Sequence, residues 1–142
     1  MVYLDLSEQE KIMEKGPVAF EKATDLSFED AIARCRESLA GQGMGVLTEI
    51  DVQATLKTKL DVDREQYVIL GACHPPSAFR ALAKRPDVGV LLPCNVTVSV
   101  EDGKTVVRAM DPRVVLGMVG EPSLAQVGEE VAAALQEVVN SV

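Results

Sequence analysis

Apolar residues recur along this chain with two different periods, and the period separates the expected helices from the expected strands. Spacings of three and four residues place side chains on one face of a helix. Two long stripes have this spacing, one at Phe28, Ile32, Cys35 and Leu39 and the other at Leu124, Val127, Val131, Leu135 and Val138. Ser27, with Asp30 three residues later, caps the first stripe. The pattern predicts long helices over residues 27–40 and 123–139.

Short apolar or alternating segments between these helices predict strands. They cover residues 18–23, 45–50, 67–73, 90–100 and 105–110. The last two flank Asp102-Gly103, a dipeptide typical of a tight hairpin, so these two strands run antiparallel. We therefore expect an α+β fold, with a mixed or antiparallel sheet of about five strands and helices packed on one face.

Three shorter helices are expected between the strands. Each begins at a capping residue or at a proline in the first helical position, and these start points are Asp51, Pro75 and Asp111-Pro112. The helix after Asp51 carries its own apolar stripe, formed by Val52, Leu56 and Leu60.

The chain divides into an N-terminal extension, residues 1–16, and a single α+β domain, residues 17–142. The second part is long enough to bury a core without disulfides or metals. A capping box at Ser7 predicts a short helix in the extension, ending near Gly16.

The charge of the chain narrows the classes of partner. Lys and Arg total 14 against 22 Asp and Glu, which gives a net charge of −8. Phosphate backbones repel such a protein, so we expect no nucleic-acid partner. No apolar segment is long enough to span a bilayer, so we expect no membrane partner.

The cysteines indicate a reducing compartment. There are three of them, without a CxxC pair, and an odd number does not suit a framework of disulfides. We therefore expect reduced thiols and a cytoplasmic location. Cys35 lies within a helical stripe, where it is predicted to be a small buried hydrophobe.

Residues 67–95 hold the candidate chemistry. Cys73 and His74 stand where a strand meets a helix, and Cys94 and Asn95 lie in the next expected strand. A single short helix usually returns the chain to a nearby strand, so we expect Cys73 and Cys94 to be close, with His74 at the rim of a shallow cavity. Cys73, His74, Cys94 and Asn95 are therefore the predicted ligand-binding residues.

Two thiols and an imidazole would suit zinc or copper. A structural zinc site needs four ligands, however, and this group supplies three. We expect neither a metal nor a cofactor, and we assign no catalytic residue. The alternative is that both cysteines are simply buried in an apolar sheet.

Several motifs resemble a bacterial and archaeal family, domain of unknown function 302. They are GVLTEIDVQATLKTKL at 45–60, YVILGACHPP at 67–76, LLPCN at 91–95 and Asp111-Pro112. The resemblance covers the chain from about Pro17 to its C-terminus. It implies an α+β fold similar to that of the TATA-binding protein, a homodimer, and no established reaction. The chain departs from the family motif at His74, where Asn is usual.

These observations favour a small cytoplasmic binding or interaction module, with an apolar cleft for a small-molecule ligand, over an enzyme. The alternative is a thiol-dependent redox protein, or one that handles metal or sulfur, using Cys73 and Cys94. We also expect a homodimer, because apolar strand surface remains after the helices are placed.

Overall fold

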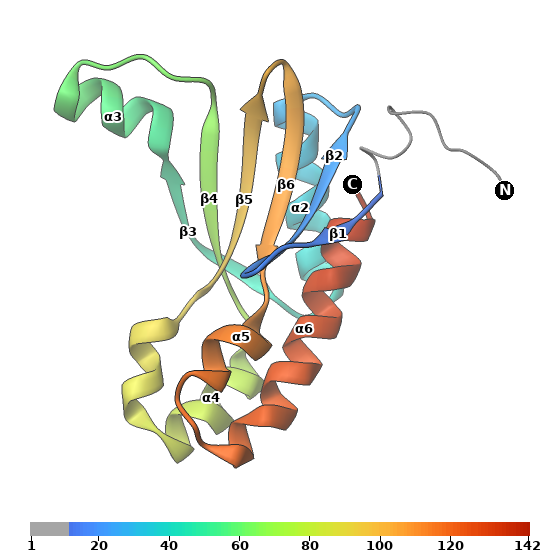
Figure 1. The fold of residues 1–142 in the computed structure, drawn as a ribbon, viewed down its shortest axis with the longest axis vertical. Helices are drawn as coiled ribbons and strands as arrows, with labels where there is room; N and C mark the ends of the chain where they lie inside the picture. Colours follow the sequence, from blue (N-terminus) through green and yellow to red (C-terminus); the bar gives the residue numbers. More distant parts are fainter. Residues whose placement is uncertain (1–11) are drawn as a thin grey trace, which may run out of the picture.

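The computed structural model describes residues 12–142 and centres on one open sheet (Figure 1). Its strands are β1 (Glu14–Lys15), β2 (Ala19–Thr24), β3 (Gly45–Asp51), β4 (Tyr67–Cys73), β5 (Cys94–Glu101) and β6 (Lys104–Met110). They lie in the order β1-β2-β6-β5-β4-β3, and every neighbouring pair is antiparallel. The predicted α+β class is confirmed, with six strands in the sheet.

Five α-helices surround the sheet within the described residues. They are α2 (Phe28–Gly41), α3 (Val52–Leu60), α4 (Pro75–Lys84), α5 (Pro112–Gly117) and α6 (Ala125–Asn140). Two 3₁₀ turns, η1 (Pro86–Leu91) and η2 (Pro122–Leu124), precede β5 and α6. Across residues 12–142, no helix combines the length and the apolar character needed to cross a membrane.

The two long helices, α2 and α6, pack on one face of the sheet, as the sequence predicts (Figure 1). Ser27 caps α2 because its side chain accepts a hydrogen bond from the backbone N–H of Asp30. The apolar stripes of both helices are buried against the valines of β5 and β6. Cys35 is fully buried in the α2 stripe, which confirms its role as a core residue.

Two segments differ from their expected structure. The end of the short helix expected up to Gly16 is instead β1, which pairs with β2; the rest of that helix lies outside the described residues. The strand expected from residue 90 begins only at Cys94, because residues 86–91 form η1. Pro86 occupies the first position of η1, and Pro93 has no N–H to donate to a strand partner.

A helical lobe lies beyond one end of the sheet and consists of α4, η1, α5 and the first half of α6 (Figure 1). Because the strands alternate in direction, β4 and β6 end at this edge and β5 begins there. Cys73, Cys94 and Met110 therefore meet the lobe at a common boundary.

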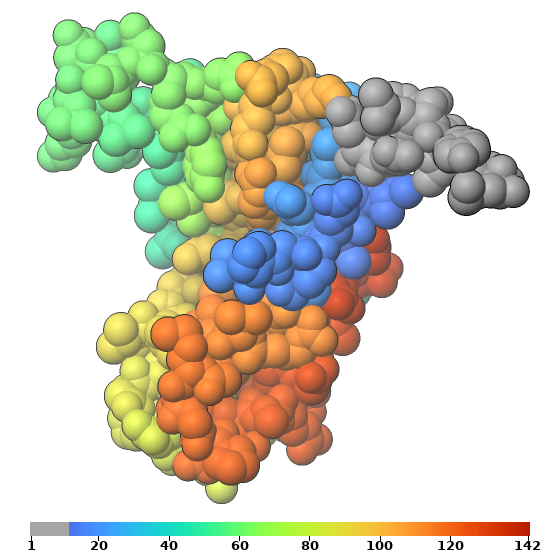
Figure 2. Space-filling model, viewed as in Figure 1, coloured from blue at the N-terminus to red at the C-terminus, as the bar shows by residue number. Residues whose placement is uncertain are grey.

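Helix α3 forms an arm that projects from the opposite end of the sheet (Figures 1 and 2). Asp51 caps it as predicted, through a hydrogen bond from the N–H of Ala54 to the Asp51 carboxylate. None of its side chains is buried by the part of the chain that the structure describes. The stripe predicted at Val52, Leu56 and Leu60 thus lies on a helix, and the described residues do not fully cover this apolar side.

Gly71 is required by the packing between β3, β4 and the start of β5. A Cβ atom at this position would overlap the hydroxyl of Thr48 and lie 2.8 Å from Cγ of Pro93. Replacement by alanine therefore forces at least one of these neighbours to move.

We expect Gly71→Ala to lower the free energy of unfolding by about 1–3 kcal/mol, the usual cost of overpacking. Urea denaturation followed by circular dichroism measures this change. Gly45→Ala is the matched control, because Gly45 also lies in a strand and its Cβ would meet no atom within 4 Å. Equal stability of the two variants would contradict this account of Gly71.

Candidate functional site

The candidate site is built around the corner at which β4 ends and α4 begins. His74 caps α4: its Nδ1 accepts a hydrogen bond from the backbone N–H of Ser77, at 3.3 Å. Pro75 and Pro76 have no N–H groups, so Ser77 supplies the first backbone donor of the helix. The corner is held by proline geometry and by this cap.

The same contact fixes the tautomer of the neutral His74 ring. A backbone N–H can only donate, so Nδ1 is the unprotonated nitrogen and Nε2 carries the proton. The hydroxyl of Ser77 lies 2.7 Å from Nδ1 and also donates to it. His74 therefore presents an N–H donor on the side of the ring that faces away from α4.

A series of polar contacts connects Ser77 to α6. Arg80 donates to the Ser77 hydroxyl oxygen at 3.4 Å and forms an ion pair with Glu130. The hydrogen bond from Arg80 is the main cause that lowers the pKa of the Glu130 carboxyl. Ser77 is buried, and a buried hydroxyl needs hydrogen-bond partners. His74 and Arg80 provide them.

Beneath the corner lies an inner cavity of about 40 Å³, between the sheet edge and the helical lobe. Its lining is almost wholly apolar and includes Ala78, Met110 and Val131. Cys73, His74 and Cys94 all line it as well, so the structure brings three of the predicted residues to one cavity. A space of this size holds a methyl or ethyl group, or a few water molecules.

The two cysteines of the cavity have different surroundings. Cys73 is half-buried, whereas Cys94 is buried and faces the core, as the alternation along its strand predicts. Burial raises the pKa of the Cys94 thiol to about 11, with a further contribution from the charge of Cys73. Cys94 is therefore a protonated thiol at neutral pH.

An outer cleft of about 340 Å³ adjoins the inner cavity. His74, Ser77 and Val131 line both spaces, so these three side chains form the wall between them. The rest of the cleft is more polar and includes Gln42, Glu130 and Glu137. The inner cavity is thus apolar, and the outer cleft beside it is polar.

Asn95 is separated from the other predicted residues. It pairs with Gly71 across the sheet, is exposed, and lies outside the lining of both spaces. Cys94 and Asn95 are consecutive in a strand, so their side chains point to opposite faces.

Sequence reasoning missed four polar residues of the site: Gln42, Ser77, Glu130 and Glu137. The spacing of Ser77, three residues after His74, is that of a helix cap and its first donor, and it offered the one local clue. Gln42 and Glu130 reach the site through the packing of α2 and α6.

The donor set does not form a metal centre in the part of the chain that the structure describes. Residues 12–142 contain no group of three or more His, Cys, Asp or Glu side chains placed to hold one ion. Cys73, His74 and Cys94 thus share a cavity without the convergence that zinc or copper requires.

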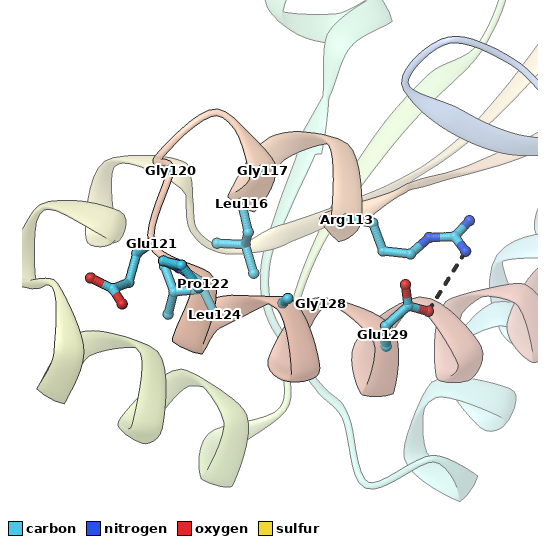
Figure 3. Close-up of a pocket in the computed structure, with 10 residues that line it drawn as sticks. Arg113, Leu116, Gly117, Gly120, Glu121, Pro122, Leu124, Gly128 and Glu129 are labelled. Carbon is cyan, nitrogen blue, oxygen red and sulfur yellow. Dashed lines mark ion pairs between the residues drawn. The ribbon is translucent and has the colours of Figure 1, made fainter.

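A larger cleft of about 380 Å³ lies between α5 and the start of α6 (Figure 3). Leu116 and Leu124 contribute apolar surface, while Arg113, Glu121 and Glu129 provide charges along it. Arg113 and Glu129 pair across one end of the cleft at 3.8 Å.

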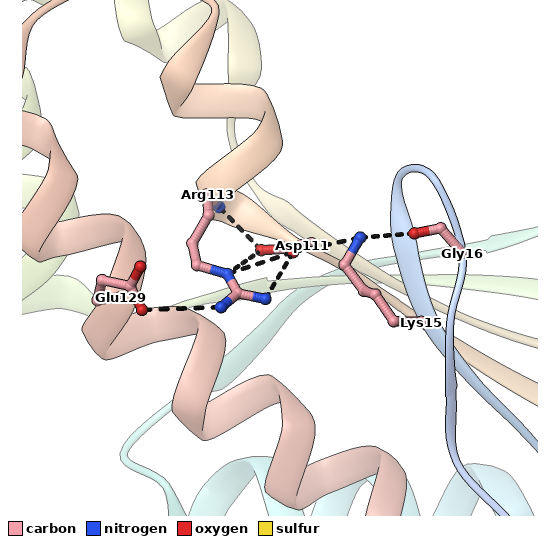
Figure 4. Close-up of polar contacts among 5 residues, drawn as sticks. All are labelled: Lys15, Gly16, Asp111, Arg113 and Glu129. Carbon is pink, nitrogen blue, oxygen red and sulfur yellow. Dashed lines mark hydrogen bonds and ion pairs between the residues drawn. The ribbon is translucent and has the colours of Figure 1, made fainter.

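Arg113 belongs to a network around the buried carboxylate of Asp111 (Figure 4). Asp111 caps α5 and binds Arg113 at 2.9 Å and Lys15 at 3.4 Å. Burial raises the pKa of Asp111, but the hydrogen bonds from Arg113 and Lys15 outweigh it and leave that pKa below its ordinary value. Both cations also lie over the ring of Phe20, at 5.6 and 5.7 Å. This network joins β1 to α5 and is structural.

Comparison with known proteins identifies a family and similar solved structures. A family model, "Domain of unknown function DUF302", matches residues 20–142. The crystal structure of an uncharacterised conserved DUF302 protein from Bacillus stearothermophilus is 28% identical, with a TM-score of 0.83. That match covers 89% of this chain and 98% of the other. No curated protein matches. Because the family model spans most of the chain, this protein belongs to the DUF302 family.

Proposed function

We propose that this protein is a small-molecule binding module whose ligand has a short apolar end and a polar head. The observation that carries this proposal is the wall formed by His74 and Ser77, with an apolar cavity on one side and a polar cleft on the other. Concave sites with apolar walls and a few placed polar groups are typical of small-molecule sites. The last one or two carbons of the apolar end enter the inner cavity past His74, and the rest of the ligand, with its head, lies in the outer cleft.

The charges of the outer cleft favour a cationic head. Glu137 contributes a carboxylate, the carboxylate of Glu130 is already paired with Arg80, and the whole chain carries a net charge of −8. The Nε2–H of His74 and the side-chain amide of Gln42 add neutral hydrogen-bond donors. A primary ammonium gains from the negative charge of the cleft, an alcohol forms hydrogen bonds without that charge attraction, and a carboxylate is repelled.

The alternative function, a thiol-dependent redox protein or one that handles metal or sulfur, uses Cys73 and Cys94. The protonated state of Cys94 does not favour it as the thiol that first attacks a substrate. We therefore keep ligand binding as the primary function, and we assign no catalytic residue. We also propose a cytoplasmic location, which the odd number of cysteines and their free thiols support.

We further propose that the protein is a homodimer that uses the β3 edge and the α3 arm. The outer edge of β3 has no partner strand within residues 12–142. Leu47, Leu60 and Val62 are exposed there by 68%, 65% and 42%. A helix of nine residues gains its stability mainly from packing, which the described chain does not provide for α3. A second copy supplies it symmetrically, because an antiparallel edge can pair with itself about a two-fold axis.

Three six-carbon compounds test the proposed ligand class: hexylamine, hexanol and hexanoate. With the same tail, we expect hexylamine to bind tightest and hexanoate weakest, each step being about threefold for partly exposed charges. Ligand-detected NMR at millimolar concentration measures the three affinities. Tightest binding by hexanoate would refute the cationic head.

The inner cavity is tested with Ala78→Leu, which fills it from α4. We expect hexylamine affinity to fall at least about tenfold, because the apolar end loses its place. Ala83→Leu adds the same side chain on the exposed side of the same helix and should leave affinity unchanged. If both variants bind as the wild type does, the cavity is not part of the ligand site.

Sedimentation at micromolar concentration tests the dimer. We expect a mass of twice the 15.2 kDa chain, and a single chain for the variants Leu47→Glu and Leu60→Glu. Val90→Glu is the control, because Val90 is 86% exposed on the helical lobe, far from the arm. A monomeric wild type, or dissociation by Val90→Glu alone, would count against this interface.

A further inference from the structure

We propose that Cys73 and Cys94 form a redox pair that a peroxide converts to an intramolecular disulfide. Both cysteines line the inner cavity and stand on the neighbouring strands β4 and β5. The structure contains both as free cysteines. Disulfide formation does not depend on ligand binding, so it stands apart from the function proposed above.

The register of the two strands sets the separation of the cysteines. Ala72 is the direct cross-strand partner of Cys94, so Cys73 is one residue from the paired position. With strands about 4.8 Å apart and a rise of about 3.4 Å per residue, the two Cα atoms are about 6 Å apart. Disulfides join residues whose Cα atoms are about 4.4–6.8 Å apart. The backbone therefore allows the bond.

The direction of the side chains also allows it. Strict alternation would turn Cys73 to the face opposite Cys94. Cys73 is the last residue of β4, however, just before the His74 corner, and it lines the same cavity as Cys94. The charge of Cys73 also acts on the Cys94 thiol, which requires the two groups to be near each other.

Exposure divides the roles of the two thiols. Cys73 is half-buried, so a small oxidant reaches it, whereas Cys94 is buried behind it. Cys73 is therefore the thiol that reacts first, and Cys94 is the one that resolves the product. Cys35 lies on α2 and is fully buried, and burial raises its pKa to about 12, so it serves as an internal control.

The chemistry balances with hydrogen peroxide as the oxidant. The Cys73 thiolate attacks one peroxide oxygen, the O–O bond breaks, and Cys73 becomes a sulfenic acid while hydroxide leaves and takes up a proton to form water. The Cys94 thiol then gives up its proton as its sulfur attacks the sulfur of Cys73, and the sulfenic hydroxyl leaves with that proton as a second water. Two thiols and one peroxide thus yield one disulfide and two waters. A small dithiol reverses the reaction by exchange.

This bond changes the space that the ligand uses. Both cysteines line the inner cavity, so a bond between their sulfurs pulls Cys73 at the corner toward Cys94. His74 follows Cys73 directly and forms the wall to the outer cleft. The disulfide is therefore expected to alter ligand affinity, a consequence that rests on the proposed function.

Mass spectrometry of the intact chain after treatment with hydrogen peroxide tests the pair. We expect a loss of about 2 Da, one remaining free thiol, and a cross-link that joins the tryptic peptides 65–80 and 85–104. Dithiothreitol should restore all three thiols. Cys35→Ala should still form the cross-link, while Cys94→Ala should stop at a sulfenic acid on Cys73 that dimedone traps. A disulfide that includes Cys35, or oxidation of Cys73 without a bond to Cys94 in the wild type, would overturn the proposal.

A second measurement separates the redox pair from the ligand site. Hexylamine affinity is compared between the reduced and the oxidised chain, and the oxidised chain after treatment with dithiothreitol is the control. A cross-link with a change in affinity supports both inferences. A cross-link in a chain that never binds hexylamine retains the redox pair and rejects the ligand class. Binding without a cross-link rejects the redox pair alone.

Discussion

The antiparallel pairing of β4 with β5 determines where the candidate chemistry lies. It joins the end of one strand to the beginning of the next, so Cys73 and Cys94 meet although a helix and a 3₁₀ turn separate them in the chain. Gly71 permits this pairing because Thr48 and Pro93 occupy the space of its absent side chain. The helical lobe then closes over the same edge, which creates the inner cavity.

Burial of apolar surface explains most of the remaining architecture. It also identifies α3 as the helix whose apolar side stays uncovered by the described residues. The helices α2 and α6 cover one face of the sheet and enclose an aliphatic core that includes Cys35 and Leu135. The arm formed by α3 follows the same apolar pattern but finds no such cover among the described residues. This contrast is the physical basis for placing a second copy at β3, whereas the corner at His74 is complete within one chain.

Local interactions were predictable from the sequence, and tertiary ones only where the connection between two elements was short. Ser27, Asp51 and Pro75 begin helices as expected, because capping and proline geometry depend on only a few neighbouring residues. The strand expected from residue 90 begins only at Cys94, because Pro86 starts η1 and Pro93 has no N–H to donate to a partner strand. The sequence could predict that Cys73, His74 and Cys94 meet, because the pairing of their two strands could be inferred from the short connection between them. Glu130 could not be placed, since nothing local relates α6 to the corner.

The ring nitrogens of His74 offer the most direct test of the account, whose central claim is that His74 and Ser77 form the wall of the ligand site. The chain has one histidine, so ¹⁵N NMR of the imidazole reports on this residue alone. At a pH where the ring is neutral, we predict an unprotonated Nδ1, a protonated Nε2, and a change in the Nε2 resonance when an alkylamine is added. A proton on Nδ1, or ring resonances that do not respond to the amine, would contradict the account.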